Sequence, residues 1–337
     1  MEREMKYGSV CSGIEAATAA WHKLGWQPSF FSEIEPFPRA VLAHHYPHVP
    51  LHGDFTTIKG DEYEPIQLLV GGTPCQSFSV AGLRGGLDDD RGNLALEFLR
   101  LADRTRPRWL VWENVPGVLS SNGGRDFGSI VGGMVQLGYG CAWRILDAQY
   151  FGVAQRRRRL FVVGYLGDWR GAAAVLFERH SLQGHPAPRR EAGKGIAGTL
   201  GGSSQSGGFR TTDLDNNGAF IPVCFGGNRT SGPIDVTPAL LAQPGAGFKC
   251  DFESETFIKT GFAHQQGGSI CHHTSAVRRL TPRECERLQG FPDDYTLVPN
   301  RGKPAADGPR YKALGNSMAV PVMRWIGERI AKMEALS

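Results

Sequence analysis

The sequence has little of what marks a membrane, secreted or zinc-ribbon protein. Among its 337 residues no apolar run approaches the roughly 20 residues of a membrane helix, and the charged start MEREMKYGSV lacks the apolar core of a signal peptide. There are only seven cysteines and no CxxC pair, so we expect neither a disulfide framework nor a zinc ribbon, and a reducing cytoplasm is the natural setting. Lys and Arg exceed Asp and Glu by 37 − 33 = 4, which permits a polyanionic partner without requiring one.

What is present describes a folded chain with one irregular stretch. Hydrophobic residues make up 41% and charged residues 21%, which excludes a largely disordered chain. The length predicts two domains at roughly 150 residues each. Residues 184–268 hold 17 glycines and 6 prolines and show no helical period, so a small β- and loop-rich domain that carries recognition is expected there. We expect residues 1–165 plus 305–337 to form the larger domain and 166–304 the small one.

The first half alternates short apolar runs with helical stretches, which predicts an α/β fold with a doubly wound parallel sheet. The expected strands are Tyr7–Cys11, Ser29–Ser32, Gln67–Val70, Trp109–Glu113, Cys141–Leu146 and Leu160–Gly164. The expected helices are Glu15–Leu24, Phe37–Tyr46, Gly92–Arg104 and Phe127–Leu137. Further along, Thr281 is expected to cap a helix through Leu288, and Ala319–Glu334 to form a terminal amphipathic helix.

Residues suited to binding a nucleotide-like ligand lie at the ends of three predicted strands. Gly13 lies at a strand-to-helix turn, where a glycine lets the backbone approach a ligand, and Glu33 ends the second strand, where an acidic residue commonly binds ribose hydroxyls. Asp54 follows a third strand and could accept a hydrogen bond from an adenine amino group. Each residue alone is more often an ordinary turn or surface residue. The first strand is not followed by GxGxxG, which argues against a dinucleotide oxidoreductase.

Cys75 differs from the other cysteines in its setting. The apolar strand within LLVGGTPCQSFS, residues 68–79, ends in two glycines, and Pro74 stiffens the loop that presents Cys75. Because ligands of α/β sheets bind at the carboxyl ends of strands, this thiol should face the cleft. A thiol needs a nearby positive charge to become a thiolate at neutral pH. The basic run 156–159 could supply this charge. Buried, inert thiols are expected at Cys11, Cys141, Cys224, Cys250 and Cys285.

Glu113 ends another strand, in WLVWENVP. After mostly apolar residues it should be partly desolvated with a raised pKa, which suits an acid that donates a proton or a hydrogen bond. A salt-bridged or helix-capping glutamate is the alternative. Four arginines precede the next strand, and the alternation of side chains along a strand places Arg157 and Arg159 towards the cleft. Arg156 and Arg158 would then face water or phosphate.

The histidines do not predict a metal site. His264, Cys271, His272 and His273 have a spacing that fits no common zinc pattern, so they are interpreted as polar loop residues. His44, His45 and His48 lie on a predicted helix and its exit and are expected at the surface.

Eight motifs follow one another along the chain: SVCSGIEAATAAW, SEIE, GDF, GGTPCQSFS, WENVPG, AQRRRRLFVVG, RRLTPRECERLQGFPDDY and RYKALGNSMAVPV. In this order they resemble the motifs of the DNA (cytosine-5)-methyltransferase family, and the PCQ, ENV and QxRxR trio is the most specific part. The resemblance covers residues 7–165 and 278–330 and stops where family members place their variable target-recognition segment. It implies a Rossmann-like S-adenosylmethionine-dependent methyltransferase fold with a second, smaller domain.

The resemblance also implies roles for individual residues. Cys75 would be the nucleophile, Glu113 would hold the cytosine ring, and Arg157 and Arg159 would be active-site arginines. The implied S-adenosylmethionine pocket is lined by Cys11, Gly13, Ile14, Glu33, Ile34, Asp54, Phe55, Pro74, Leu94, Asn316 and Ser317, and the implied DNA contacts are Gln76, Ser79 and Arg91. The chain departs from the family's pattern at Cys11 and Ile34, where aromatic residues are common, and at Glu15-Ala16, where paired glycines are common.

The implied reaction is methyl transfer from S-adenosylmethionine to carbon 5 of a flipped-out cytosine in a specific duplex sequence, through a covalent cysteine adduct and without a metal. Double-stranded DNA is the implied partner, a cognate restriction endonuclease is a further candidate, and a monomer in the cytoplasm of a bacterium or phage-infected cell is expected. Two alternatives stay open. One is a tRNA cytosine methyltransferase with the same catalytic trio. The other is a catalytically inactive DNA-binding regulator, against which the intact Cys75, Glu113 and both arginines argue.

Overall fold

The computed structural model describes residues 5–74, 93–177, 223–225, 257–260, 276–300 and 302–336. Cys75, Gln76, Ser79 and Arg91 lie outside these ranges, as do Cys250 and the histidine-containing segment 264–273. The predictions made for those residues therefore remain predictions.

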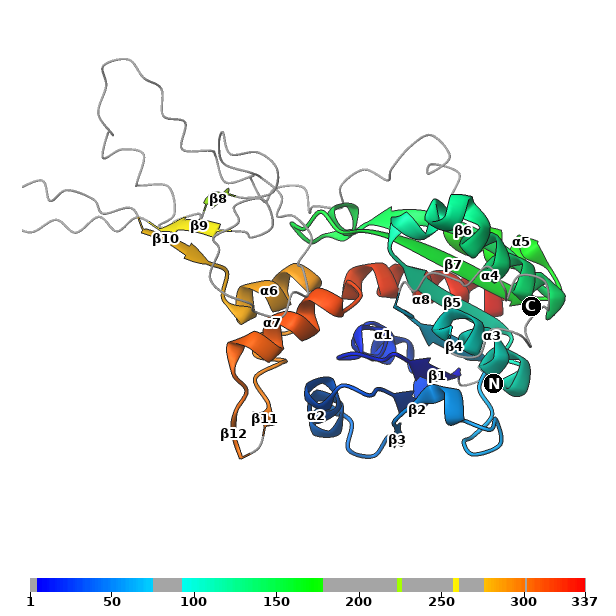
Figure 1. Ribbon diagram of the computed structural model, residues 1–337, viewed down its shortest axis with the longest axis horizontal. Coiled ribbons are helices and arrows are strands. Elements are labelled where there is room, and N and C mark those ends of the chain that lie inside the picture. Colours follow the sequence, from blue (N-terminus) through cyan, green and yellow to red (C-terminus); the bar gives the residue numbers. More distant parts are fainter. Residues whose placement is uncertain are drawn as a thin grey trace, which may run out of the picture.

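A seven-stranded sheet forms the centre of the molecule, in the order β3-β2-β1-β4-β5-β7-β6 (Figure 1). Its strands are β1 (Lys6–Val10), β2 (Gln27–Ser32), β3 (Leu51–His52), β4 (Leu68–Gly71), β5 (Trp109–Asn114), β6 (Tyr139–Asp147) and β7 (Arg158–Leu166). Strands β1 to β5 pair in parallel, and the order reverses between β1 and β4. The predicted α/β doubly wound fold and each of its predicted strands are confirmed.

The prediction of an all-parallel sheet is wrong for β7, which pairs antiparallel with both β5 and β6. Residues 148–157 join β6 to β7 and contain one short 3-10 turn, Ala148–Phe151. A parallel connection needs a crossover of a dozen or more residues, usually with a helix. The short link therefore returns the chain directly, and the first residues of β7 arrive beside the carboxyl end of β5.

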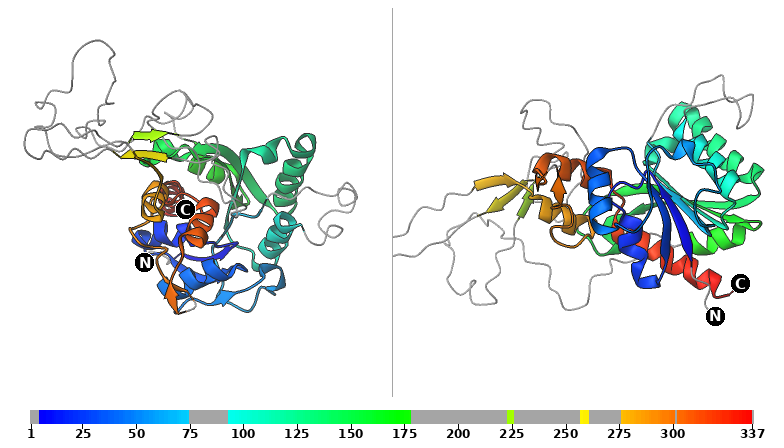
Figure 2. Two further views of the ribbon diagram at one scale, coloured as in Figure 1. Left: turned by 60° about the vertical axis from the view of Figure 1, so that its left-hand side comes forward. Right: turned by 90° about the horizontal axis from the view of Figure 1, so that it is seen from below.

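Helices cover both faces of the sheet (Figure 2). They are α1 (Ala16–Trp21), α2 (Pro36–His45), α3 (Leu94–Thr105), α4 (Arg125–Gln136), α5 (Trp169–Leu176), α6 (Pro282–Gln289), α7 (Asp307–Asn316) and α8 (Val320–Glu334). Side chains of β5 alternate between two cores because successive strand residues face opposite ways. Trp109 and Val111 pack in the core with α1, α5 and α8, whereas Leu110 and Trp112 pack in the core with α3 and α4.

The last helix brings the end of the chain back to its beginning. The indole N–H of Trp21 on α1 donates to the carbonyl of Met323 on α8 at 2.7 Å. Gly327 is required at the contact, since a Cβ there would lie 2.4 Å from the Trp21 ring. This packing places the α7–α8 junction, which contains the predicted Asn316 and Ser317, next to the turn after β1.

The region expected to form the small domain contains an antiparallel sheet of β8 (Val223–Phe225), β9 (Phe257–Thr260) and β10 (Ala276–Arg279). Thr281 caps α6, as predicted, and the structure adds a capping box with Glu284. The paired residues β11 (Pro299–Asn300) and β12 (Lys303–Pro304) follow. Helix α5 and several side chains between 280 and 298 are nevertheless buried in the larger core. The range 166–304, expected for the small domain, therefore includes residues that pack in the larger core.

The surface prediction for the histidines holds only in part at His45, which is half-buried. Its ring stacks on Tyr295 with centroids 4.1 Å apart, and its Nε2 lies 2.7 Å from the Tyr295 carbonyl oxygen. His44 and His48 are exposed, as expected. The α2 pattern alone could not reveal a partner that lies 250 residues further along the chain.

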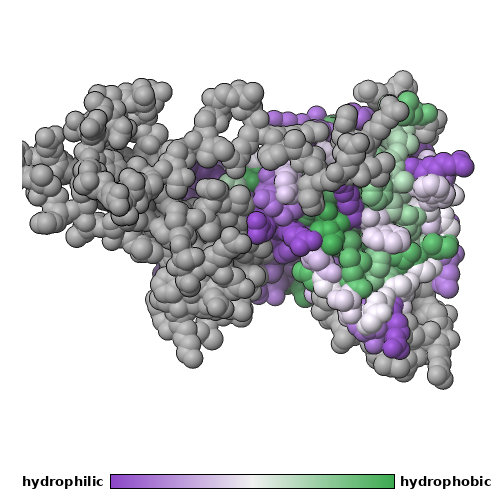
Figure 3. Space-filling model, turned by 90° about the horizontal axis from the view of Figure 1, so that it is seen from above, coloured by the Kyte–Doolittle hydropathy of each residue, from purple (hydrophilic) through white to green (hydrophobic). Residues whose placement is uncertain are grey.

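Within the described ranges no helix has the length and apolar character to cross a bilayer. Figure 3 views the molecule from the side of α4 and β6 and shows a hydrophobic area set among polar side chains. Val135 on α4 and Trp143 on β6 are among the exposed large apolar residues. Scattered apolar residues of this kind are ordinary on a folded protein.

Candidate functional site

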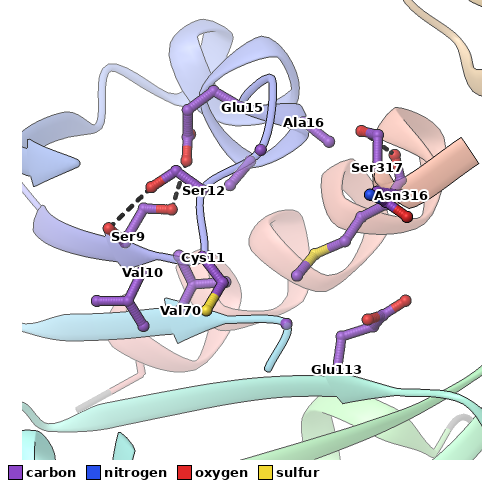
Figure 4. Close-up of a pocket in the computed structure, with 14 residues that line it drawn as sticks. Ser9, Val10, Cys11, Ser12, Glu15, Ala16, Val70, Glu113, Asn316 and Ser317 are labelled. Carbon is purple, nitrogen blue, oxygen red and sulfur yellow. Dashed lines mark hydrogen bonds between the residues drawn. The ribbon is translucent and has the colours of Figure 1, made fainter. Parts of the chain in front are cut away.

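One pocket lies at the carboxyl ends of β1, β4 and β5 (Figure 4). Its walls come from the turn after β1, from Val70 and Gly72 at the end of β4, from Glu113 at the end of β5, and from residues 316–318 at the α7–α8 junction. It holds about 400 Å³ of empty space, part of it open to solvent. The pocket lies at the point where the strand order reverses, which is where doubly wound sheets bind ligands.

The turn after β1 contains left-handed residues at Cys11 (φ 49°), Gly13 (φ 56°) and Glu15 (φ 61°). A Cβ on Gly13 would meet nothing within 4 Å, so glycine is favoured by its backbone angle and leaves open space for a ligand. Glu15 is buried, and its carboxylate accepts hydrogen bonds from the Ser9 hydroxyl and from the backbone N–H (3.0 Å) and hydroxyl of Thr18. A single carboxylate thus fixes the turn and caps α1.

Burial raises the pKa of Glu15, although its hydrogen bonds with Ser9 and Thr18 act in the opposite direction. Because its pKa in the folded state exceeds that in the unfolded state, its contribution to stability decreases as pH rises from the unfolded pKa through the folded pKa. Glu15→Gln has a similar shape but does not titrate. We expect this variant to be more stable relative to wild type at pH 7 than at pH 4.5, measured by urea unfolding at both pH values. An unchanged difference would contradict the raised pKa.

Glu33 connects the ends of β1 and β2. Its carboxylate accepts hydrogen bonds from the backbone N–H groups of Gly13, Ile34 and Glu35, each at 2.8 Å. The neighbouring Ile34 side chain is 68% exposed. A carboxylate at a strand end beside an exposed apolar side chain offers both an acceptor for hydroxyl groups and an apolar contact for a planar ring.

The other residues predicted for the cofactor pocket divide into three groups. Cys11, Gly13, Asn316 and Ser317 line the pocket. The side chains of Ile14 and Phe55 are buried in the hydrophobic cores instead. The remaining predicted residues lie near the strand ends without lining the pocket: Asp54 caps the turn Phe55–Thr57, Pro74 is exposed, and Leu94 begins α3.

The thiol of Cys11 has the inert character expected of it. Burial raises its pKa to about 12, and the negative charges of Glu33 and Asp54 act in the same direction. The group therefore stays protonated at neutral pH and contributes a small apolar surface to the pocket.

Two arginines, Arg157 and Arg159, lie near Glu113 at the carboxyl end of β5. The antiparallel return of β7 brings Arg159 Nε to 3.2 Å from Glu113 Oε1. Arg157 is 2% exposed; its guanidinium donates to the Gly315 carbonyl at 3.1 Å and its backbone N–H donates to Asp147 Oδ1 at 3.1 Å. Arg156 and Arg158 are exposed, so the predicted alternation of the four arginines is observed.

Burial and charge oppose one another in this group. Burial raises the pKa of Glu113, while the charges of Arg157 and Arg159 lower it. Burial also lowers the pKa of Arg157 to about 9, assisted by Arg159 and opposed by Glu113. The result is a carboxyl group that takes up a proton more readily than a solvated one, as the apolar strand before it predicts.

Gly72 allows Glu113 to occupy this position. A Cβ there would lie 3.0 Å from Glu113 Oε2 and 3.1 Å from Met318 Cε. We expect Gly72→Ala to displace the carboxylate and reduce kcat by about 10- to 100-fold, since small misplacements of reacting groups have large effects on rate. Single-turnover kinetics would measure this. Gly128→Ala on α4, where an added methyl meets nothing within 4 Å, should be neutral, and equal rates for both variants would refute the positioning effect.

Sequence reasoning missed several residues of the site. The GG pair was noted without its relation to Glu113, and Met318 was overlooked although it lies in the pocket next to Ser317. Asp147, which holds the backbone of Arg157, follows an ordinary strand pattern and gave no signal. Glu15 was noted only as a departure from paired glycines.

Comparison with known proteins agrees with this arrangement. Residues 5–213 and 234–332 match the family described as C-5 cytosine-specific DNA methylase. "DNA N-6-adenine-methyltransferase" of Escherichia phage P1 is 38% identical over 98% of this chain, which spans 61% of the phage protein. "Type II methyltransferase M2.BsuMI" of Bacillus subtilis (strain 168) is 29% identical, covering 97% of this chain and 76% of that protein.

Among solved structures, the Entamoeba histolytica methyltransferase EhMeth superposes with a TM-score of 0.63 at 15% identity, covering 100% of both chains. At this identity the likeness establishes the fold alone. The family match extends over most of the sequence and includes the strand ends, Glu113, the arginine run and the α7–α8 junction. The chain therefore belongs to the C-5 cytosine-specific DNA methylase family.

Proposed function

We propose that this protein transfers a methyl group from S-adenosylmethionine to carbon 5 of a cytosine that is flipped out of duplex DNA. The observation that carries the proposal is the pairing of Arg159 with the buried Glu113, which lines the same pocket as the Gly13 turn. The first part of this pocket suits a nucleoside-containing donor. The second part suits a ring that must be protonated on one nitrogen and hydrogen-bonded on a carbonyl.

The residues present fit S-adenosylmethionine. Glu33 would accept hydrogen bonds from the ribose hydroxyls, and Ile34 would cover the adenine ring. The open space beside Gly13 would admit the amino acid part of S-adenosylmethionine. Asn316 and Ser317 would complete the pocket from the other side. When bound, S-adenosylmethionine supplies a methyl group on a positively charged sulfur. The reaction needs no metal.

The chemistry of the chain follows from the low reactivity of carbon 5 in an aromatic ring. The Cys75 thiolate adds to carbon 6 and forms a sulfur–carbon bond, while the protonated Glu113 carboxyl donates to the ring nitrogen. Carbon 5 then carries enamine electron density and takes the methyl group. Loss of the carbon 5 proton to solvent, expulsion of the thiolate and return of the ring-nitrogen proton to Glu113 restore the aromatic ring. Arg159 hydrogen-bonds the carbonyl of the base, and Arg157 holds the α7–α8 junction against this site through Gly315.

Access to the ring requires that the cytosine leave the duplex, at a cost of a few kcal/mol. The exposed Arg156 and Arg158 and, outside the described residues, Gln76, Ser79 and Arg91 would contact the DNA. The segment between α5 and α6 would read the target sequence. We further propose that the protein acts as a monomer in the cytoplasm. A cognate restriction endonuclease is a candidate partner, since the names of several relatives describe Type II methyltransferases.

A tRNA cytosine methyltransferase would use the same catalytic residues, and incorporation of labelled methyl groups separates the two substrates. We expect transfer from S-adenosylmethionine into duplex DNA and none into tRNA. Bisulfite sequencing of DNA from cells that express the protein would then identify the target. Transfer into tRNA alone would refute the DNA substrate. DNA binding without any transfer would favour the inactive regulator.

A further inference from the structure

A buried carboxylate holds the loop that follows α6. Glu286 on α6 is 0% exposed, and it accepts hydrogen bonds from the backbone N–H groups of Asp294 (2.7 Å) and Thr296 (2.8 Å) and from the Thr296 hydroxyl. Arg310 on α7 donates to Glu286 at 3.1 Å and to the Thr296 hydroxyl at 2.9 Å. A fully partnered carboxylate of this kind fixes the backbone on either side of one residue, Tyr295.

Tyr295 extends from this fixed loop to the turn after β1. Its hydroxyl donates to the carbonyl of Ile14 at 2.9 Å, within the left-handed stretch between Cys11 and Glu15. The Tyr46 hydroxyl lies 3.0 Å from the Tyr295 hydroxyl, and because the single Tyr295 proton is engaged with Ile14, Tyr46 is the donor in that contact. The His45 ring stacks on the Tyr295 ring and hydrogen-bonds the Tyr295 carbonyl. The ring is therefore held at its face, its hydroxyl and its backbone.

The same network approaches the pocket from a second direction. Helix α7 carries Arg310 and ends at Asn316, which lines the pocket with Ser317. On α6, the buried Gln289 amide donates to the Leu314 carbonyl near the end of α7 at 2.7 Å. Helix α6 itself follows β10 after only Leu280 and Thr281. Helix α6 and the loop that follows it therefore contact two walls of the cofactor pocket. One is the turn after β1 and the other is the α7–α8 junction.

We propose that Tyr295 is a positioning residue for cofactor binding, which acts by fixing the Ile14 carbonyl and with it the turn that receives S-adenosylmethionine. The proposal rests on the proposed function, because it assumes that this turn binds the donor. Phenylalanine at this position would keep the ring and its stacking but would leave the Ile14 carbonyl without its donor. The loss should therefore appear in cofactor affinity rather than in the chemical step.

The test compares two tyrosine-to-phenylalanine variants in the full chain. Tyr295→Phe is expected to raise the Kd for S-adenosylmethionine about tenfold, measured by calorimetry without DNA, and to change kcat at saturating cofactor by less than about twofold. Tyr139→Phe is the matched control, because the Tyr139 hydroxyl is also buried and donates to a backbone carbonyl, that of Pro107 at 2.6 Å, away from the pocket. It should lower thermal stability and leave the Kd unchanged.

The outcomes separate the two proposals. If the wild type does not bind S-adenosylmethionine, the proposed function fails. If the wild type binds and Tyr295→Phe binds equally well, or if Tyr139→Phe weakens binding to the same extent, the positioning role fails. Should Tyr295→Phe not fold, His45→Ala decides the question. This partly exposed residue supports Tyr295 without contacting Ile14, and its loss should weaken binding by about two- to threefold. Unchanged binding in that variant would overturn the inference.

Discussion

Cys75→Ala is expected to reduce methyl transfer by about 10⁴-fold or more, because the first bond to carbon 6 can no longer form. A duplex containing 5-fluorocytosine at the target traps the intermediate, since fluorine at carbon 5 cannot leave as a proton does. With S-adenosylmethionine present, the wild type should form an adduct that survives denaturing electrophoresis, and Cys75→Ala should form none.

Cys141→Ala provides the matched control for the loss of a thiol. Cys141 lies on β6 away from the pocket, and burial raises its pKa to about 11, so it is not a nucleophile at neutral pH. This variant should trap the duplex as the wild type does. An adduct that persists in Cys75→Ala would show that another residue attacks the ring.

Glu113→Gln is expected to lower kcat by about 10²- to 10⁴-fold, the usual contribution of a positioned acid. The amide keeps the shape of the carboxyl group but cannot transfer a proton to the ring nitrogen, and it no longer pairs with Arg159. Because burial raises the pKa of Glu113, the wild-type rate should fall on the alkaline side as the carboxyl group loses its proton. The variant should lack that alkaline limb.

Single-turnover rates across pH, with preformed complexes of enzyme, DNA and S-adenosylmethionine, would measure both effects. Glu97→Gln on α3 is a suitable control, since Glu97 is a half-buried carboxylate paired with Arg100 outside the pocket. It should retain the wild-type rate and pH profile. A Glu113→Gln variant with the same profile as the wild type would remove Glu113 from the proton-transfer step.

The strands and helices of the larger domain could be predicted because their signals are local. An apolar strand such as Leu68–Gly71 ends at a pair of glycines, and Thr281 and Glu284 form a capping box that can be read from the sequence. The alternation of the arginines also followed from strand geometry alone. The direction of β7 depended instead on the length of the link before it, which a pattern of alternating elements does not take into account.

The contacts that complete the site were not predictable in the same way, because they join distant parts of the chain. Gly72 is required by a carboxylate on another strand, and Tyr295 reaches Ile14 across 281 positions. The contact of half-buried His45 with Tyr295 could not be predicted for the same reason. Neither hydrophobic periodicity nor residue spacing records such pairings, whereas the family resemblance indicated which segments approach one another without specifying the atoms.

The identity of the methylated atom tests the account most directly, since the phage P1 relative carries a name that specifies adenine N6 and extends well beyond the part matched by this chain. Duplex DNA incubated with the purified protein and S-adenosylmethionine would be digested to nucleosides and analysed by mass spectrometry. The account predicts 5-methyl-2′-deoxycytidine as the product in the wild type and its absence in Cys75→Ala. Methyl groups found on adenine N6, or on cytosine in the Cys75→Ala variant, would contradict it.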